Sequence, residues 1–332
     1  MHKHLSLRRQ LLRCLPVVMS WCAGLGLSHA HAQSFPNKPI RWVVVAPAGS
    51  SLDVIARAMQ DKLKDNLGQS VVIENKPGTG GGIGATYVAK APADGYTLLG
   101  GTISTHAINA SLYKNLPYDP VKDFEPVSLV AFLPNVLLVG AQSGINSVAE
   151  LIAVLKKDET RRTFASSGAG TSTHLAGELM ADLINVPLTH IAYKGTPPAM
   201  MDVAAGQVTF MFDQLTAAIP LIQAGKLKLL AVGSLKRSPL FPNVPTLDEA
   251  GLKGFDADSV FGFYAPAGTP ADVVNRVNRE INKILGTQAL KDRIQNLGGE
   301  ALPLTPAEFG ARAADDSKRF GAIIRERKIV GD

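Results

Sequence analysis

The sequence predicts an α/β fold in two lobes, each built on a mostly parallel sheet covered by helices. From residue 39 onward, short runs rich in β-branched residues alternate with longer segments whose apolar residues recur at helical spacing. Two further apolar runs, 127–133 and 261–266, are placed to carry the chain from one group of strands to the other and back. Residues 34–332 are also long enough for two substantial cores.

Each strand and helix is predicted from its own pattern. A β-branched run gives a strand over 40–46, and apolar positions at helical spacing give a helix over 52–67 that Gly68 ends. The alternation continues with strands over 70–74, 96–100, 136–139, 162–165, 188–192, 208–212 and 227–232, and with helices over 83–90, 148–157, 174–184, 199–205 and 217–224. A strand over 261–266 and helices over 271–285, 288–297 and 306–327 complete the chain.

The two crossing segments divide the chain into lobes. Lobe I is expected to contain residues 34–132 and 260–332, and lobe II residues 133–259, with a cleft between them. Ligands of open α/β sheets bind where the carboxyl ends of strands turn into helices. The strand-to-helix turns are therefore the first places to look for a site.

The first 32 residues have the pattern of a secretory signal peptide. A basic start is followed by a short, mostly apolar run over 15–27 and by Ala30-His31-Ala32, an A-x-A cleavage site. The apolar run is shorter than the roughly 20 residues that a membrane span needs. We expect export with cleavage after Ala32, by a route left open because residues 6–12 also resemble a twin-arginine signal.

Cleavage would change the composition of the chain. Both cysteines, Cys14 and Cys22, lie in the leader, so the mature chain would have neither a disulfide nor a thiol nucleophile. Of 34 basic and 28 acidic residues, the leader holds four basic and no acidic ones, which leaves 30 against 28. The net charge falls from +6 to +2, and no basic run remains that would indicate nucleic-acid binding.

Three strand-to-helix turns carry small and hydroxyl residues suited to an anion. Residues 47–53 place Gly49 and two serines at a helix start, where free N–H groups carry partial positive charge. Residues 165–174 and 100–106 repeat the chemistry, without a long cation in any of the three. A serine or an aspartate such as Asp53 is also a common helix cap, so capping remains the alternative for a single turn.

The glycine-rich run over 76–85 is predicted to be a flexible surface turn. It contains a G-x-G-x-x-A match from Gly80 to Ala85 after a strand. A dinucleotide site also requires an acidic residue at the end of the next strand, and none stands near Leu99.

Signatures of common enzymes and metal sites are missing from the sequence. It contains no G-x-S-x-G, G-x-x-x-x-G-K-[ST] or H-E-x-x-H motif. His106, His174 and His190 lack metal-ligand spacing, so we interpret them as capping or packing residues, and we expect no metal and no cofactor. Asp213 and the pair Lys194-Gly195 follow strands and either face the cleft or are solvated loop residues.

Motifs distributed along the chain resemble the Bug family, the periplasmic solute-binding proteins of tripartite tricarboxylate transporters. They are A-G-S-S-x-D at 48–53, E-N-K-P-G at 74–78, D-G-Y-T-L-L at 94–99, T-H-A-I-N at 105–109, L-P-Y-D-P-V-K-D-F at 116–124, T-x-x-H-L-A-G-E at 171–178, Y-K-G at 193–195, A-G-K-L-K-x-L-A-V at 224–232, V-P-T-x-x-E-A-G at 244–251 and A-P-A-G-T-P at 265–270. The resemblance covers essentially the whole mature chain in order.

The resemblance implies a type II periplasmic-binding-protein fold in which the turns hold a ligand carboxylate between the lobes, partly through waters. The residues expected at the site, from the turns and from the resemblance together, are Ala48, Gly49, Ser50, Ser51, Asp53, Thr102, Ser104, His106, Ala107, Ser167, Gly168, Gly170, Thr171, Ser172, Lys194, Gly195 and Asp213. This chain departs from the family's P-G-G-[ST]-T-D, because Ser50 replaces a glycine and Leu52 replaces a hydroxyl residue.

Leu52 admits two interpretations. As an apolar wall beside the first turn, it would favour an aromatic carboxylate over citrate; as the start of the stripe Leu52, Ile55, Met59 and Leu63, it would belong to the core. Thr171 and Ser172 are expected to supply hydroxyl donors to the ligand.

The leading functional hypothesis is a monomeric periplasmic protein that captures a small organic carboxylate, aromatic or dicarboxylate, and delivers it to transporter membrane subunits. A binding protein serving a sensor kinase is the alternative, and the sequence does not separate the two. A hydrolase using Asp53 or Asp213 ranks third, since no paired acid and base is evident.

Overall fold

The computed structural model describes residues 35–326 and 328–329. Every helix and strand named below belongs to one compact unit that begins at Lys38. The expected signal peptide, residues 1–32, lies outside the described residues. In the described ranges, no helix combines the length and the apolar character that crossing a membrane would require.

The first group of strands forms two parallel β-α-β units. β1 (Ile40–Val44) leads through α2 (Ser51–Leu67) to β2 (Val71–Asn75), and then through α3 (Gly82–Ala89) to β3 (Thr97–Thr102). β1 lies between β2 and β3 and pairs in parallel with both. After β3 come the short π-helical turn η2 (Ser104–Ile108) and α4 (Asn109–Leu112), which the sequence pattern did not predict.

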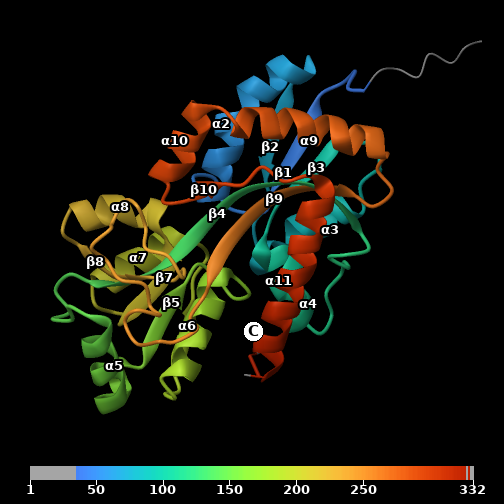
Figure 1. The fold of residues 1–332 in the computed structure, drawn as a ribbon. Helices are drawn as coiled ribbons and strands as arrows, with labels where there is room; N and C mark the ends of the chain where they lie inside the picture. The colour runs from blue at the N-terminus through green and yellow to red at the C-terminus, as the bar shows by residue number, and fades with distance from the viewer. Residues whose placement is uncertain (1–34, 327, 330–332) are drawn as a thin grey trace, which may run out of the picture. The chain divides into compact units, whose positions relative to one another are not determined.

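A single long strand, β4 (Phe124–Gly140), connects the first group to the second (Figure 1). Up to Pro134 it pairs antiparallel with β9 (Asp258–Pro266), and from Asn135 onward it pairs antiparallel with β7 (Phe210–Gln214). The sequence indicated two separate segments here, 127–133 and 136–139. They form one strand. Pro134, which has no N–H to donate, is tolerated within it because it stands where β4 changes partners from β9 to β7.

The second group repeats the β-α-β pattern. α5 (Val148–Lys157) precedes β5 (Thr163–Ser166), α6 (Ser172–Leu183), β6 (Thr189–Ala192), α7 (Thr196–Ala204), β7, α8 (Leu215–Gln223) and β8 (Leu227–Val232). β5 pairs in parallel with β6 and β7, whereas β8 pairs antiparallel with β4. Apolar clusters cover this sheet, one of them built around Phe164, Phe210, Phe212 and Phe255.

The chain then returns to the first group. β9 pairs antiparallel with β3, so the sheet order is β2-β1-β3-β9-β4-β7-β5-β6. α9 (Ala271–Leu285) packs against α2 and β4, α10 (Gln288–Asn296) packs against the two-residue strand β10 (Glu300–Ala301), and α11 (Pro306–Glu326) packs against η2 and β4. Two strands, β4 and β9, therefore connect two helix-covered groups. The antiparallel pairs of the described sheet, which depart from the expected parallel order, each contain one of these two strands or both.

Candidate functional site

The strand-to-helix turns of the two groups meet. The hydroxyl of Ser51, at the start of α2, lies 3.2 Å from the hydroxyl of Thr216 in α8. A Cβ placed on Gly195, which precedes α7, would lie 3.8 Å from Cγ of Pro47. The turn after β1 thus contacts the turns after β6 and β7, although about 150 residues separate them in the sequence.

The first turn is held together by its own residues. Ser50 caps α2 by accepting a hydrogen bond from the amide of Asp53, and the Asp53 carboxylate accepts from the Gly49 amide at 2.9 Å, from Arg57 Nε at 2.9 Å and from Asn75 Nδ2 at 2.9 Å. Burial raises the pKa of Asp53, but these hydrogen bonds outweigh it and hold the pKa below its usual value. Asp53 therefore braces the turn and fixes the start of α2.

Both departures from the family motif prove compatible with this turn. Ser50 has a φ of −67°, an extended conformation that requires no glycine. Leu52 is 1% exposed, so its side chain belongs to the core and offers no apolar wall to a ligand. Of the two interpretations of Leu52, the structure supports the core stripe, and the argument for an aromatic ligand that rested on this residue is lost. Ala48 and Gly49 are exposed.

The second turn, between β5 and α6, is also fixed internally. Thr171 caps α6: its hydroxyl accepts from the His174 amide and donates to the Gly168 carbonyl at 2.7 Å. The hydroxyls of Ser172 and Ser259 lie 2.7 Å apart, which ties α6 to β9. Both hydroxyls expected to bind a ligand are thus engaged within the protein. Because the His174 amide is bonded to Thr171, the amides of Ser172 and Thr173 are the donors that remain at the start of α6. Ser167 and Gly168 are partly exposed, and Gly170 is buried.

His174 and His190 support the second turn. The His174 ring accepts from the Gly170 amide at 3.3 Å and stacks on His190 with centroids 3.9 Å apart. His190 Nε2 lies 2.7 Å from the Ser166 hydroxyl. Burial, together with the neighbouring His174, lowers the pKa of His190 to about 3, so this ring is neutral near pH 7. The prediction that these two histidines cap and pack is confirmed.

The third stretch, 102–107, lies mostly in the interior. Ser104, His106 and Ala107 are at most 5% exposed, and only Thr102 is partly exposed. The His106 ring stacks on Tyr264 at 3.5 Å, and burial lowers its pKa to about 3. Three of the four residues named here as candidates therefore have side chains that pack inside the protein.

The glycine-rich run is not the flexible surface turn that the sequence suggested. It forms a 3₁₀ turn over Thr79–Gly81 that leads into α3, and Gly81 is buried. A Cβ on Gly80 would lie 2.9 Å from the Gly170 carbonyl oxygen and 2.7 Å from Asn109 Oδ1. The run therefore packs against the second turn. The consecutive glycines directly before a helix were a sequence signal for such close packing. The residue against which they pack, Gly170, lies some ninety positions away and could not be identified from the sequence.

The remaining candidates follow β6 and β7. Lys194 is exposed, and Gly195 has a φ of 116°, a backbone conformation suited to glycine. Asp213 is fully buried and accepts hydrogen bonds from the Thr196 hydroxyl at 2.6 Å and the Gln214 amide at 2.7 Å. Burial raises the pKa of Asp213 to about 6, against the lowering effect of these two donors.

This raised pKa predicts a pH dependence of stability. The stabilising contribution of Asp213 is complete below pH 4 and is lost as the pH rises through about 6. Urea unfolding at pH 4 and pH 7 should show Asp213→Asn gaining stability relative to wild type at the higher pH, by on the order of 3 kcal/mol for a shift of two units. Asp61→Asn, at an exposed position, is the control. An equal stability difference at both pH values would contradict the assignment.

The assembled site offers backbone amides and few charged side chains. α2, α6, α7 and α8 all begin where the turns meet. α8 has no side-chain cap on its first amides, whereas Pro197 and Pro198 in the first turn of α7 have no amide hydrogen to donate. Helix N-termini of this kind attract anions. No group of three His, Cys, Asp or Glu side chains among the described residues is arranged to hold a metal ion. The geometry thus suits a small anion, and a carboxylate is the organic anion that amide donors bind well.

Comparison with known proteins agrees with this chemistry. A model of the tripartite tricarboxylate transporter family receptor matches residues 55–329. A UPF0065 protein of Pseudomonas sp. (strain P51) is 39% identical over 89% of this chain and 88% of its own length.

Several solved structures share both the fold and the sequence pattern. The periplasmic binding protein BugD is 36% identical, with a TM-score of 0.83 over 89% of this chain and 99% of its own. An R. palustris protein with adipate is 34% identical, with a TM-score of 0.84 over 89% and 99% of the two chains. MatC from Rhodopseudomonas palustris with bound malate is 32% identical, with a TM-score of 0.82 over 87% and 100%. The two-lobed periplasmic-binding-protein fold is thereby shown.

Proposed function

Because this chain belongs to the tripartite tricarboxylate transporter receptor family, we propose that it captures a small organic carboxylate in the periplasm and delivers it to the membrane subunits of such a transporter. The observation that carries the proposal is the meeting of helix N-termini from both groups of strands. α2 comes from the first group, whereas α7 and α8 come from the second, and Ser51 contacts Thr216 between them. An anion bound there would contact both groups at once.

A dicarboxylate suits this arrangement better than an aromatic acid. The N-termini of α2 and of α6 lie in different groups, and ahead of the capped amides of Asp53 and His174 each helix has two amides that could bind one carboxylate of the same molecule. The relatives solved with adipate and with malate each contain a dicarboxylate. We propose that the division between the lobes lies at residues 132/133 and 259/260, close to the point where β4 exchanges β9 for β7 as its partner.

A thermal-shift panel of dicarboxylates, aromatic carboxylates and amino acids tests the proposal. A true ligand at one hundred times its Kd stabilises the folded protein by about 2.7 kcal/mol. Adipate and its uncharged diamide form a matched pair, since only adipate presents carboxylates to the helix N-termini. Stabilisation by the diamide equal to that by adipate, or by no carboxylate in the panel, would refute carboxylate capture.

Ligand binding is expected to close the two lobes. A ligand that bridges amides of both groups favours the arrangement in which the groups approach most closely, and β4 and β9 are the strands that must bend. Small-angle scattering with saturating ligand should therefore give a smaller radius of gyration than scattering without ligand. A scattering curve that does not change at saturation would argue against closure.

A further inference from the structure

One face of the first group of strands is left partly uncovered. α3 has only eight residues, roughly 12 Å of helix, and it crosses from the carboxyl ends of the strands toward their amino ends. Arg41 of β1 is in register with Val72 of β2 and Thr97 of β3, so these three side chains project from the same face. Beyond the last turn of α3 this face is open, and Val72 is 46% exposed.

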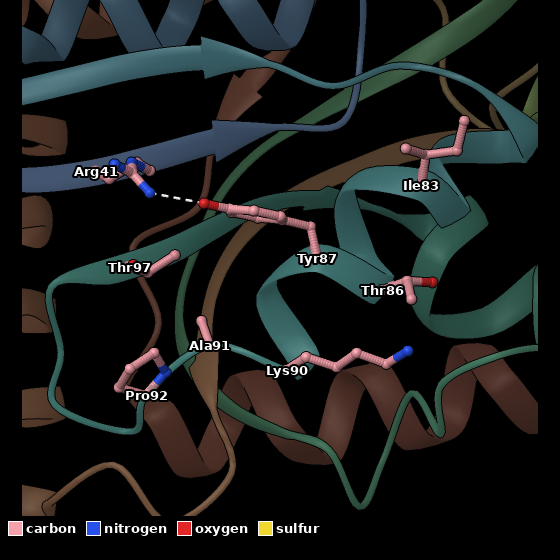
Figure 2. Close-up of a pocket in the computed structure, with 8 residues that line it drawn as sticks. All are labelled: Arg41, Ile83, Thr86, Tyr87, Lys90, Ala91, Pro92 and Thr97. Carbon is pink, nitrogen blue, oxygen red and sulfur yellow. Dashed lines mark hydrogen bonds between the residues drawn. The ribbon is translucent and has the colours of Figure 1, made fainter.

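A pocket of about 510 Å³ occupies this place (Figure 2). Tyr87 of α3 lies at its centre: Arg41 Nη1 donates to the Tyr87 hydroxyl at 2.6 Å, and Lys76 Nζ lies 4.5 Å from the ring centroid. Two basic side chains thus hold the ring in place, while it stays 39% exposed. A rigid, exposed tyrosine beside an arginine is the kind of anchor on which protein interfaces depend. The pocket is lined by Arg41, Ile83, Thr86, Tyr87, Lys90, Ala91, Pro92 and Thr97.

Exposed apolar side chains concentrate on this surface. In the part of the chain that the structure describes, six large hydrophobic residues are classed as exposed, and three of them, Val72, Ile83 and Tyr87, lie here. Ile83 and Tyr87 are four residues apart on α3, so they share one side of the helix. Clustering of this kind marks an interaction surface, whereas scattered exposed residues need no explanation.

The charge of this surface is positive. Arg41, Lys76 and Lys90 surround the tyrosine, and Glu74, which lies 3.0 Å from Arg41 Nε and 3.8 Å from Lys76 Nζ, is the acidic residue paired with them. A second copy of this chain would bring the same positive surface and be repelled. An acidic partner would be attracted.

We propose that this surface docks a segment of the transporter membrane subunits that combines acidic and apolar side chains. The inference depends on the proposed transport function. Arg41 is near the amino end of β1 and the first ligand turn follows its carboxyl end, so Arg41 and that turn are roughly 20 Å apart along the strand. Lys76, whose amide donates to the Val44 carbonyl, forms the edge of the surface nearest the turn. Docking here leaves the ligand site open, and because the surface lies in the first group alone, its affinity for the membrane subunits is the same with and without ligand.

The test measures binding of the mature protein, beginning at Gln33, to the purified membrane subunits of the tripartite tricarboxylate transporter that it is proposed to serve. Tyr87→Ala with Lys90→Glu should weaken binding at least tenfold, and added NaCl should weaken binding of the wild type. The matched control is Leu235→Ala with Lys157→Glu, an exposed apolar residue and an exposed lysine outside this surface, which should change binding less than twofold.

Three results would overturn the docking inference: equal binding by the Tyr87 and Lys90 variant and the wild type, no binding by the wild type, or a dimer in sedimentation experiments that Tyr87→Ala dissociates. Each is separable from carboxylate capture, because melting shifts with adipate and malate report on the ligand site alone. Those shifts should be the same in wild type and in both double variants.

Discussion

Replacing Gly170 by alanine should lower the affinity for a carboxylate ligand at least tenfold. Gly170 has a φ of 75°, and a Cβ there would stand 2.5 Å from the Tyr113 hydroxyl and 3.1 Å from its ring. The left-handed backbone costs an alanine about 1 to 2 kcal/mol, and the contact with Tyr113 adds to that cost. Tyr113 donates to the Ala169 carbonyl of the same turn, so displacing its hydroxyl disturbs the turn and with it the amides at the start of α6. Since 1.4 kcal/mol is a factor of ten in affinity, calorimetry with a ligand from the carboxylate panel will detect the loss.

Gly206→Ala is the control for the backbone effect. Gly206 has a φ of 76°, nearly the same as Gly170, but a Cβ there would meet no atom within 4 Å. Both variants should lose stability through the left-handed conformation, and only Gly170→Ala should lose affinity beyond that. Equal affinities for the two variants would show that the turn before α6 does not hold the ligand.

The alternation of strands and helices was predictable because local patterns determine it. α2 illustrates this: Leu52, Ile55, Met59 and Leu63 form the expected buried stripe, and Gly68 ends the helix with a φ of 71°. β4 was harder to predict, since Pro134 reads as a break in a strand, whereas here it marks the exchange of β9 for β7 as partner. η2 and α4 are too short to show a helical period.

The candidate site was predictable as a set of turns but less so residue by residue. The sequence indicates which turns carry hydroxyls, yet it cannot show that Ser172 uses its hydroxyl on Ser259, 87 positions away. Nor does it show that the glycines near Gly80 pack on Gly170. Long-range contacts of this kind decide whether a polar group is free for a ligand. Once these hydroxyls are bonded within the protein, the backbone amides at the helix N-termini remain as donors for a ligand. Those groups leave no particular residue pattern in the sequence.

Replacing Gly262 by alanine should destabilise the protein by about 1 to 3 kcal/mol, the usual cost of overpacking a core. Gly262 lies in β9, one of the two strands that connect the groups, and every residue of this strand is buried. A Cβ there would stand 2.2 Å from Cζ and 2.8 Å from Cε1 of Phe309, which α11 places on the strand. Urea unfolding should show a lower midpoint at an unchanged slope.

Phe309 provides the test of this mechanism, because the clash is with one ring. Phe309→Leu alone removes buried ring atoms and should destabilise the wild type, yet in the Gly262→Ala protein it removes the atoms that meet the new methyl group and should restore stability. Residues in contact couple in this way by 0.5 to 3 kcal/mol, whereas distant ones add. Phe320 is another fully buried phenylalanine of α11, but the three atoms nearest to a Cβ at Gly262 all belong to Phe309, so Phe320→Leu should simply add its own cost. If Phe309→Leu were as additive as Phe320→Leu, steric conflict with the ring would not be the reason that β9 has glycine at position 262.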